Sequence, residues 1–150
     1  MPKITPFLWF DTQAEDAMKL YVSIFKNSKT GRIMRSGGKV MSVTFELEGQ
    51  NFMALNGGPT FHFTPAVSLF VDCETQDEVD DLWRRLAEGG EPGRCGWLTD
   101  KFGLSWQIIP KGLGEMLSDS NPARSQRVMK AMLQMDKINI GGLKRAYAGK

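Results

Sequence analysis

Two stretches of the chain repeat the same order of features, and this repeat constrains the fold more than any other property of the sequence. Each runs from an apolar strand through an Asp into TQxE and an amphipathic helix: WFDTQAEDAMKLYVSIF around Thr12, and FVDCETQDEVDDLWRRL around Thr75, 63 residues later. Three strand patterns follow the first helix and at least two follow the second, where a glycine-rich gap leaves room for a short third. Neither half is large enough to bury its own sheet face, so the sequence predicts a duplicated β-α-β-β-β unit in an α+β fold.

The repeat predicts one domain of 150 residues made of two modules and a helical tail. We expect the first module over residues 1–60, the second over 61–110, and a helical C-terminal extension over 111–150. Alternating and apolar runs between turn signals predict the strands. These lie near residues 3–10, 30–35, 39–48, 51–56, 65–72, 94–98 and 103–109.

Capping patterns predict where the helices begin. Thr12 with Glu15, and Thr75 with Glu78, have the spacing of a capping box, in which each side chain accepts a hydrogen bond from a free backbone amide. In the extension, Asn121 followed by a proline is a common N-terminal cap. The Met-rich basic segment 122–135 then forms a helix that either packs against the rest of the chain or binds a partner.

Composition excludes several classes of function. Nineteen basic and seventeen acidic residues give a net charge of +2, which is too balanced for a nucleic-acid-binding or membrane-surface protein. No apolar run approaches the roughly 20 residues of a membrane span. Because the N-terminus lacks a signal-peptide pattern, we expect Cys73 and Cys95 to be reduced thiols in a cytoplasmic protein.

Strand alternation divides the predicted sheets into two faces. One face is entirely apolar and is expected to form the core under the two helices: Phe7, Trp9, Val43, Phe45, Leu47, Met53, Leu55, Val67, Leu69, Val71, Leu104, Trp106 and Ile108. The other mixes aromatic, small and polar residues: Leu8, Phe10, Ser42, Thr44, Glu46, Phe52, Ala54, Asn56, Ser68, Phe70, Ser105, Gln107 and Ile109.

The mixed face suits a partly solvated ligand cavity, although an outer surface or a subunit contact would have a similar composition. The predicted ligand-binding residues are Phe52, Ala54, Asn56, Ser68, Phe70, Ser105 and Gln107. Two residues of this face have side chains suited to catalysis, namely Glu46 as a base and Gln107 as a hydrogen-bonding group.

The sequence resembles the PhnB-like branch of the vicinal oxygen chelate superfamily, which includes glyoxalase I, bleomycin-resistance proteins and extradiol dioxygenases. This branch is often labelled as a 3-demethylubiquinone-9 3-methyltransferase domain. The stretches that carry the resemblance are TPFLWFDTQAEDAMKLYVSIF, VTFELEGQNFMALNGGPTFHFTPAVSLFVDCETQDEVDDLW and CGWLTDKFGLSWQIIP, and it extends to NPARSQRVMKAMLQMDKI in the tail. It implies a glyoxalase/bleomycin-resistance/dioxygenase-like fold with curled mixed sheets, and a homodimer with ligand-sized clefts.

Metal-dependent members of that superfamily hold a divalent ion with His, Gln or Glu side chains from four strands. By resemblance these four positions fall at about Ile4, Ala54, Ala66 and Gln107, of which only the last has a side chain able to ligate. The single histidine, His62, lies in the loop PTFHFTP, where a surface position is expected. We therefore expect no metal and no cofactor.

These observations lead to two main hypotheses of function. The first is a metal-independent protein that binds a small apolar or aromatic molecule. The second is an enzyme of the same fold that acts on an oxygenated metabolite with Glu46 or Gln107. Methyl transfer, which the family label suggests, would need a glycine-rich loop between a parallel strand and a helix, and the glycine pairs are expected at hairpin turns and helix ends instead.

Overall fold

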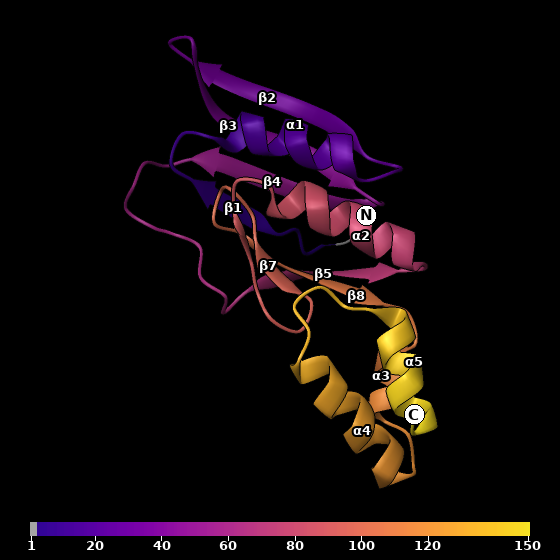
Figure 1. Cartoon of the computed structure of the whole chain (residues 1–150). Coiled ribbons are helices and arrows are strands. Elements are labelled where there is room, and N and C mark those ends of the chain that lie inside the picture. Colours follow the sequence, from indigo (N-terminus) through magenta and orange to yellow (C-terminus); the bar gives the residue numbers. More distant parts are fainter. Residues whose placement is uncertain (1–2) are drawn as a thin grey trace. The chain divides into compact units, whose positions relative to one another are not determined.

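The computed structural model describes residues 3–150, which form two compact units that meet in sequence between Phe63 and Thr64. The first unit contains β1 (Phe7–Phe10), α1 (Ala14–Ile24), β2 (Lys29–Ser36), β3 (Lys39–Leu47) and β4 (Gln50–Asn56). Its sheet has the order β1-β4-β3-β2, in which β1 is parallel to β4 and the other pairs are antiparallel (Figure 1). This is the predicted β-α-β-β-β module.

The core of the first unit lies between α1 and one face of this sheet. Val43, Phe45 and Leu47 of β3 are buried, as predicted from their alternation. Phe45 pairs with Phe52 across the hairpin, and their rings stack with centroids 5.3 Å apart. Tyr21 of α1 covers this pair, with its ring 6.3 Å from that of Phe45.

The predicted faces of β1 and β4 are wrong. Phe52 and Ala54 are 5% and 0% exposed and belong to the core with Leu8 and Phe10 of β1, whereas Phe7, Trp9, Met53 and Leu55 lie on the opposite side. Residues paired across neighbouring strands share a face. Because the runs FLWF and FMAL are apolar at both parities, composition could not identify the buried face, and only the hairpin register with β3 does so.

Asn56 is a helix cap rather than a residue of the open sheet face. Its Oδ1 accepts a hydrogen bond from Ala14 N at 2.9 Å, and its Nδ2 donates to Val40 O at 3.1 Å. The predicted cap of α1 by Thr12 is therefore wrong: the helix begins after Gln13, which makes no side-chain cap, and a strand end supplies the acceptor.

The second unit repeats this topology. It contains β5 (Ser68–Cys73), α2 (Gln76–Ala87), β6 (Glu91–Pro92), β7 (Trp97–Thr99) and β8 (Ser105–Pro110), in the sheet order β5-β8-β7-β6. The short strand β6 fills the glycine-rich gap, so the second module also has three strands after its helix. The Thr75 cap is confirmed, because its hydroxyl accepts a hydrogen bond from Glu78 N at 3.1 Å. Val67, predicted as core, lies just before β5 and is exposed.

The core of the second unit lies between α2 and its sheet. Buried residues of α2 pack over buried residues of β7, β8 and the turn that joins them: Val79, Leu82, Leu86, Leu98, Leu104, Trp106 and Ile108. The predicted core positions in β8 are thus confirmed. None of the helices in residues 3–150 has the length and apolar character needed to cross a membrane.

Three helices follow the second module, as predicted: α3 (Leu113–Leu117), α4 (Pro122–Leu133) and α5 (Ile140–Ala148) (Figure 1, orange to yellow). The Asn121 cap of α4 is confirmed by a hydrogen bond from Ala123 N to its Oδ1 at 3.0 Å. The helices share an apolar cluster with the end of β8, formed by Ile109, Leu113, Val128, Ile138 and Leu143. We call residues 111–150 the extension.

Candidate functional site

The sheet of the second unit has one face covered by α2, and the other, here called open face B, carries two rows of side chains across β5, β8 and β7. The pairing of strands places hydroxyl groups in one row, Ser68, Ser105 and Thr99. It places two aromatic rings around an amide in the other, Phe70, Gln107 and Trp97. Directly paired residues have Cβ atoms roughly 5 Å apart, so the side chains within each row are neighbours.

Gln107 is held in place by the neighbouring row. Its Nε2 donates a hydrogen bond to Ser68 Oγ at 2.9 Å, which fixes the plane of the amide. This bond leaves the carbonyl oxygen of Gln107 without a hydrogen-bond donor among the described residues. The half-buried amide can therefore accept a hydrogen bond from a molecule lying between Phe70 and Trp97.

A buried carboxylate builds the hairpin that carries this row. Asp100 is 2% exposed, and its Oδ1 accepts hydrogen bonds from Phe102 N at 2.9 Å and Leu104 N at 3.0 Å. Its Oδ2 accepts one from Trp106 Nε1 at 2.9 Å. The motif TDKFGLSW is thus a structural turn, since Asp100 fixes the alignment of β7 and β8 and so the pairing of Trp97 with Gln107.

The structure brings together four of the seven predicted ligand-binding residues, because Ser68, Phe70, Ser105 and Gln107 all lie on open face B. Phe70 is 60% exposed, whereas Ser105 is 2% exposed and its side chain is enclosed. The other three, Phe52, Ala54 and Asn56, belong to the first unit and do not lie on the open side of its sheet.

Trp97 is a residue of this face that the sequence reasoning missed. The sequence pattern predicts a strand here but does not by itself give the side on which Trp97 lies. The signal was available: Leu98 is apolar and precedes the Asp100 turn, and a buried Leu98 requires Trp97 to point to the opposite side.

The sheet of the first unit also has a side away from α1, here called open face A. Its apolar part consists of Phe7, Trp9, Met53 and Leu55, and Ser42, Thr44 and Glu46 lie beside it on β3. Glu46 is half-buried at the end of β3, where it pairs with Lys29 of β2 and Asn51 of β4. The candidate base Glu46 thus belongs to the first unit and the candidate amide Gln107 to the second.

Trp9 is fixed by the segment ALNGGP. Its Nε1 donates to Gly58 O at 3.0 Å, and its ring meets Phe61 edge-on with centroids 4.9 Å apart. A Cβ atom at Gly57 would lie 2.3 Å from Cζ2 of the Trp9 ring, so only glycine fits there. This motif therefore has a packing role.

The four residues that the resemblance places at the metal positions have side chains that do not fit a metal ion. Ala54 has a methyl group in the core, Ile4 and Ala66 are aliphatic and exposed, and Gln107 alone offers an oxygen. Among residues 3–150, no three His, Cys, Asp or Glu side chains lie close enough together to hold an ion. A divalent ion generally needs at least three convergent ligands, so no step of a mechanism is derived through one.

The remaining reactive side chains are the thiols of Cys73 and Cys95 and the imidazole of His62. Burial, followed by the charges of Glu78 and Asp72, raises the pKa of the Cys73 thiol to about 12, so it is no nucleophile near neutral pH. Cys95 is a free, half-buried thiol in the turn before β7. His62 is exposed in the loop after β4, as expected.

Comparisons with known proteins agree with this architecture. Residues 2–109 match the family model described as 3-demethylubiquinone-9 3-methyltransferase. A PhnB protein from Bacillus cereus is 40% identical over 73% of this chain and 99% of that chain, with a TM-score of 0.68. Protein PA1353 from Pseudomonas aeruginosa is 19% identical over 73% of this chain and 98% of that chain, with a TM-score of 0.62, and shows the fold alone.

A glyoxylase/bleomycin resistance protein/dioxygenase domain from Frankia sp. EAN1pec also matches, at 16% identity over 75% of this chain and 95% of that chain, with a TM-score of 0.49. None of the curated proteins matches the chain. The family match ends at residue 109, so the extension lies outside the matched residues, and the expected resemblance of the tail stays a prediction.

Proposed function

Because the chain belongs to the 3-demethylubiquinone-9 3-methyltransferase family and repeats one β-α-β-β-β unit, we infer its function from the side chains that its two sheets present. From this premise we propose that it is a metal-independent small-molecule-binding protein. Its ligand is an uncharged compound with an aromatic part, and it binds on open face B. The observation that carries the proposal is the row Phe70, Gln107 and Trp97, an oriented amide between two aromatic side chains.

The polar groups of this face indicate the charge of the ligand. Ser68, Thr99 and Gln107 are uncharged and offer hydrogen bonds only. The charged residues on this side of the strands, Asp72 and Glu91, are both acidic and exposed at its edges. A charged ligand would lose hydration without gaining a desolvated counter-ion, which is unfavourable, whereas a neutral donor-bearing ring pairs with the amide and covers the aromatic side chains.

Three compounds of one shape test this proposal: benzamide, which is neutral and polar, benzoate, which is charged, and ethylbenzene, which is apolar. We expect benzamide to raise the melting temperature of the protein more than benzoate or ethylbenzene. Gln107→Met keeps the volume of the side chain but removes its hydrogen bond to the ligand. The affinity for benzamide should therefore fall about 5- to 10-fold, which corresponds to the roughly 1–1.4 kcal/mol of one hydrogen bond. Gln126→Met, at an exposed position of α4, is the control and should change nothing.

Two results would overturn the proposal. One is equal binding of benzamide by the Gln107→Met variant and the wild-type protein. The other is a divalent metal ion present in stoichiometric amount in the purified protein and required for binding.

A second candidate function is catalysis on an oxygenated metabolite. The observation that favours it is Glu46, a half-buried carboxylate on the same side of the sheet as the apolar residues of open face A and opposite Asn51 in the strand register. A general base needs a position of this kind next to bound substrate. In that case a turnover would be detected that Glu46→Gln abolishes without lowering the melting temperature.

Methyl transfer, as named in the family description, has less support in the residues. The connections from β1 to α1 and from β5 to α2, Asp11–Gln13 and Glu74–Thr75, contain no glycine to bring the backbone close to a nucleotide-like cofactor. Calorimetry that detects S-adenosylmethionine binding would restore this function. We also propose, from the family resemblance, that the protein is a homodimer, for which light scattering should give twice the mass of one chain.

A further inference from the structure

The extension begins where the family match ends, and it is built onto the second sheet beside the proposed ligand face. The Bacillus cereus relative matches over 99% of its own length but only 73% of this chain, so it has no counterpart of the extension. The extension is nevertheless ordered by its own apolar cluster around Val128, Ile138 and Leu143. It therefore adds a feature to a fold that relatives build without it.

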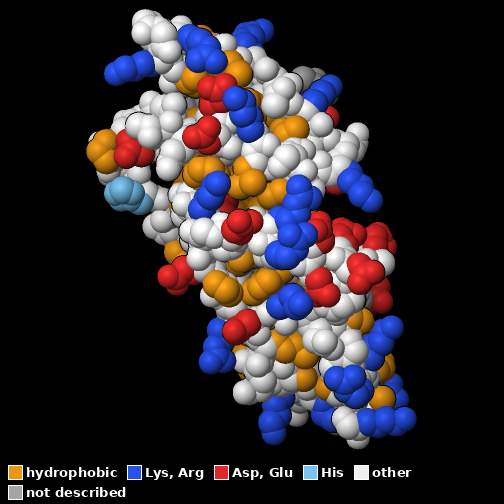
Figure 2. All heavy atoms as spheres, turned by 45° about the horizontal axis from the view of Figure 1, so that its top comes forward, with side chains coloured by type: hydrophobic (Ala, Val, Ile, Leu, Met, Phe, Trp, Pro, Cys, Tyr) orange, Lys and Arg blue, Asp and Glu red, His pale blue; other side chains and the backbone are white. Residues whose placement is uncertain are grey.

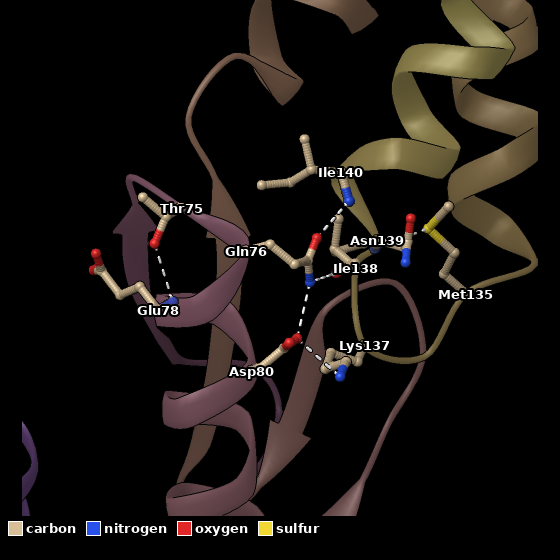
Figure 3. Close-up of polar contacts among 9 residues, drawn as sticks. All are labelled: Thr75, Gln76, Glu78, Asp80, Met135, Lys137, Ile138, Asn139 and Ile140. Atoms are coloured by element: carbon tan, nitrogen blue, oxygen red, sulfur yellow. Dashed lines mark hydrogen bonds and ion pairs between the residues drawn. The ribbon is translucent and has the colours of Figure 1, made fainter.

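One side chain of α2 attaches the extension through both the oxygen and the nitrogen of its amide group (Figure 3). Gln76 Oε1 accepts a hydrogen bond from Ile140 N at 2.7 Å, and its Nε2 donates to Ile138 O at 3.0 Å. The Nε2 also donates to Asp80 Oδ1 at 2.9 Å, which in turn pairs with Lys137 Nζ at 2.8 Å. We call these five residues the Gln76 latch.

Opposite charges support the latch. The extension has eight basic and three acidic residues, a net charge of +5, whereas residues 64–110 of the same unit have four basic and nine acidic, a net charge of −5. Basic side chains are frequent over the lower end of Figure 2, and acidic ones gather to the right of its centre. A second ion pair joins Lys111 to Glu74. The hydrogen bonds from Lys137 and Gln76 hold the pKa of Asp80 below its usual range.

Backbone hydrogen bonds connect the extension with the segment directly before β7, the strand that carries Trp97. Cys95 N donates to Met135 O and Gly96 N donates to Asp136 O, both at 2.8 Å. Gly96 O in turn accepts from Ile108 N at 2.7 Å, next to Gln107. Cys95 has a φ of +58°, which is unfavourable for a residue with a side chain, so its conformation needs these contacts with the extension to persist.

The extension also closes one end of open face B. Ile109 lies two residues after Gln107 and on the same side of β8, yet it is buried against the apolar cluster of the extension. A Cβ atom at Gly96 would lie 2.7 Å from Ile109 Cδ1 and 3.1 Å from Ile138 Cγ1, so the three residues are in close contact. The surface available beyond Gln107 ends here.

We propose that the extension is a wall of the ligand site on open face B and that Gln76 is the positioning residue that sets it. The wall fixes Trp97 against the ligand and limits the ligand's length toward Ile109. This inference rests on the proposed function and adds a determinant of specificity that the Bacillus cereus relative lacks.

The test uses the full-length Gln76→Leu variant, with Gln126→Leu on the exposed surface of α4 as control. In Gln76→Leu we expect amide exchange at Cys95, Gly96 and Ile140 to become at least about 10-fold faster, because the bonds that protect them open more often. Benzamide affinity should fall about 5-fold, and the ratio of 2-naphthamide affinity to benzamide affinity should rise as the wall recedes. The control should match the wild-type protein. If Gln76→Leu does not fold, Lys137→Met serves instead, because it removes only the ion pair with Asp80. Its effects on amide exchange and on ligand affinity should have the same direction and be smaller.

Faster exchange with unchanged affinities for both amides would overturn the inference and leave the proposed function intact. Unchanged exchange at Cys95 and Gly96 would also overturn it. Failure of the wild-type protein to bind either amide would overturn the proposed function, and this inference with it.

Discussion

Replacing Asp100 by Asn should destabilise the protein by about 3 kcal/mol. The two oxygens of Asp100 accept hydrogen bonds from Phe102 N, Leu104 N and Trp106 Nε1 in a site that is 2% exposed. In Asp100→Asn the remaining oxygen can still accept the hydrogen bonds from Phe102 N and Leu104 N. The new NH2 group then faces Trp106 Nε1, and because both groups are donors, this hydrogen bond is lost. The lost bond to a charged acceptor costs about 1.5–3 kcal/mol, and the two bonds that remain lose charge assistance worth roughly 0.5 kcal/mol each.

Urea and thermal unfolding followed by circular dichroism measure this effect. For a chain of this length, about 3 kcal/mol corresponds to a fall in melting temperature of roughly 6–12 °C. Asp16→Asn, an exposed carboxylate in the first turn of α1, is the control and should change stability by less than about 0.5 kcal/mol.

A double-mutant cycle tests the reason for the effect. Trp106→Phe removes the indole N–H, so Asp100→Asn should cost less in that background than in the wild-type protein. A loss below about 1 kcal/mol for Asp100→Asn, or equal losses in the two backgrounds, would refute the role assigned to the buried carboxylate.

Three further changes test other parts of the structure. Gly57→Ala should cost about 1–3 kcal/mol in urea unfolding, because the new methyl group meets the Trp9 ring, whereas Gly114→Ala meets nothing within 4 Å and should be neutral or stabilising. The pKa of Cys73 is about 12 in the folded state against an ordinary value of 9.0, so the protein should lose stability by ~1.4 kcal/mol per pH unit as pH rises from 9 to 12. Cys73→Ala should lack this slope. The hydrogen bond from Lys137 lowers the pKa of Asp80 in the folded protein. The ionised Asp80 therefore stabilises the fold at pH values above its ordinary pKa of about 4, and this stabilisation is lost as the pH falls through the lower pKa of the folded state. Asp80→Asn should therefore differ from the wild-type protein at pH 6 and approach it at low pH, and a difference that does not shrink would contradict the assignment.

The repeat and the helix caps made most of the fold predictable from the sequence. The TQxE pattern around Thr75 identified α2, and the alternation of β3 identified Val43, Phe45 and Leu47 as core. The same pattern failed at Thr12, since α1 is capped by Asn56 from 42 residues away, and such a long-range contact leaves no local signal.

The part of the candidate site in β8 could be predicted from the sequence, whereas the part in β1 and β4 could not, for a physical reason. In β8 polar and apolar residues alternate, so the side of Gln107 could be deduced and is confirmed by its pairing with Phe70. In β1 and β4 both sides are apolar, and the buried side is decided by the pairing of Phe52 with Phe45, which depends on the two-residue turn Glu48–Gly49 and not on the composition of the strands. The attachment of the extension through Gln76 depends on a contact across 62 to 64 residues and was likewise not deducible.

The most direct test of the central claim is an NMR titration of the wild-type protein with benzamide. A compound of this size should bind with a Kd on the order of 1 mM. The account predicts that the indole N–H signal of Trp97 and the side-chain amide signals of Gln107 shift together and saturate with one Kd, while the indole signal of buried Trp106 stays fixed. Saturable shifts that leave Trp97 and Gln107 unchanged would contradict it.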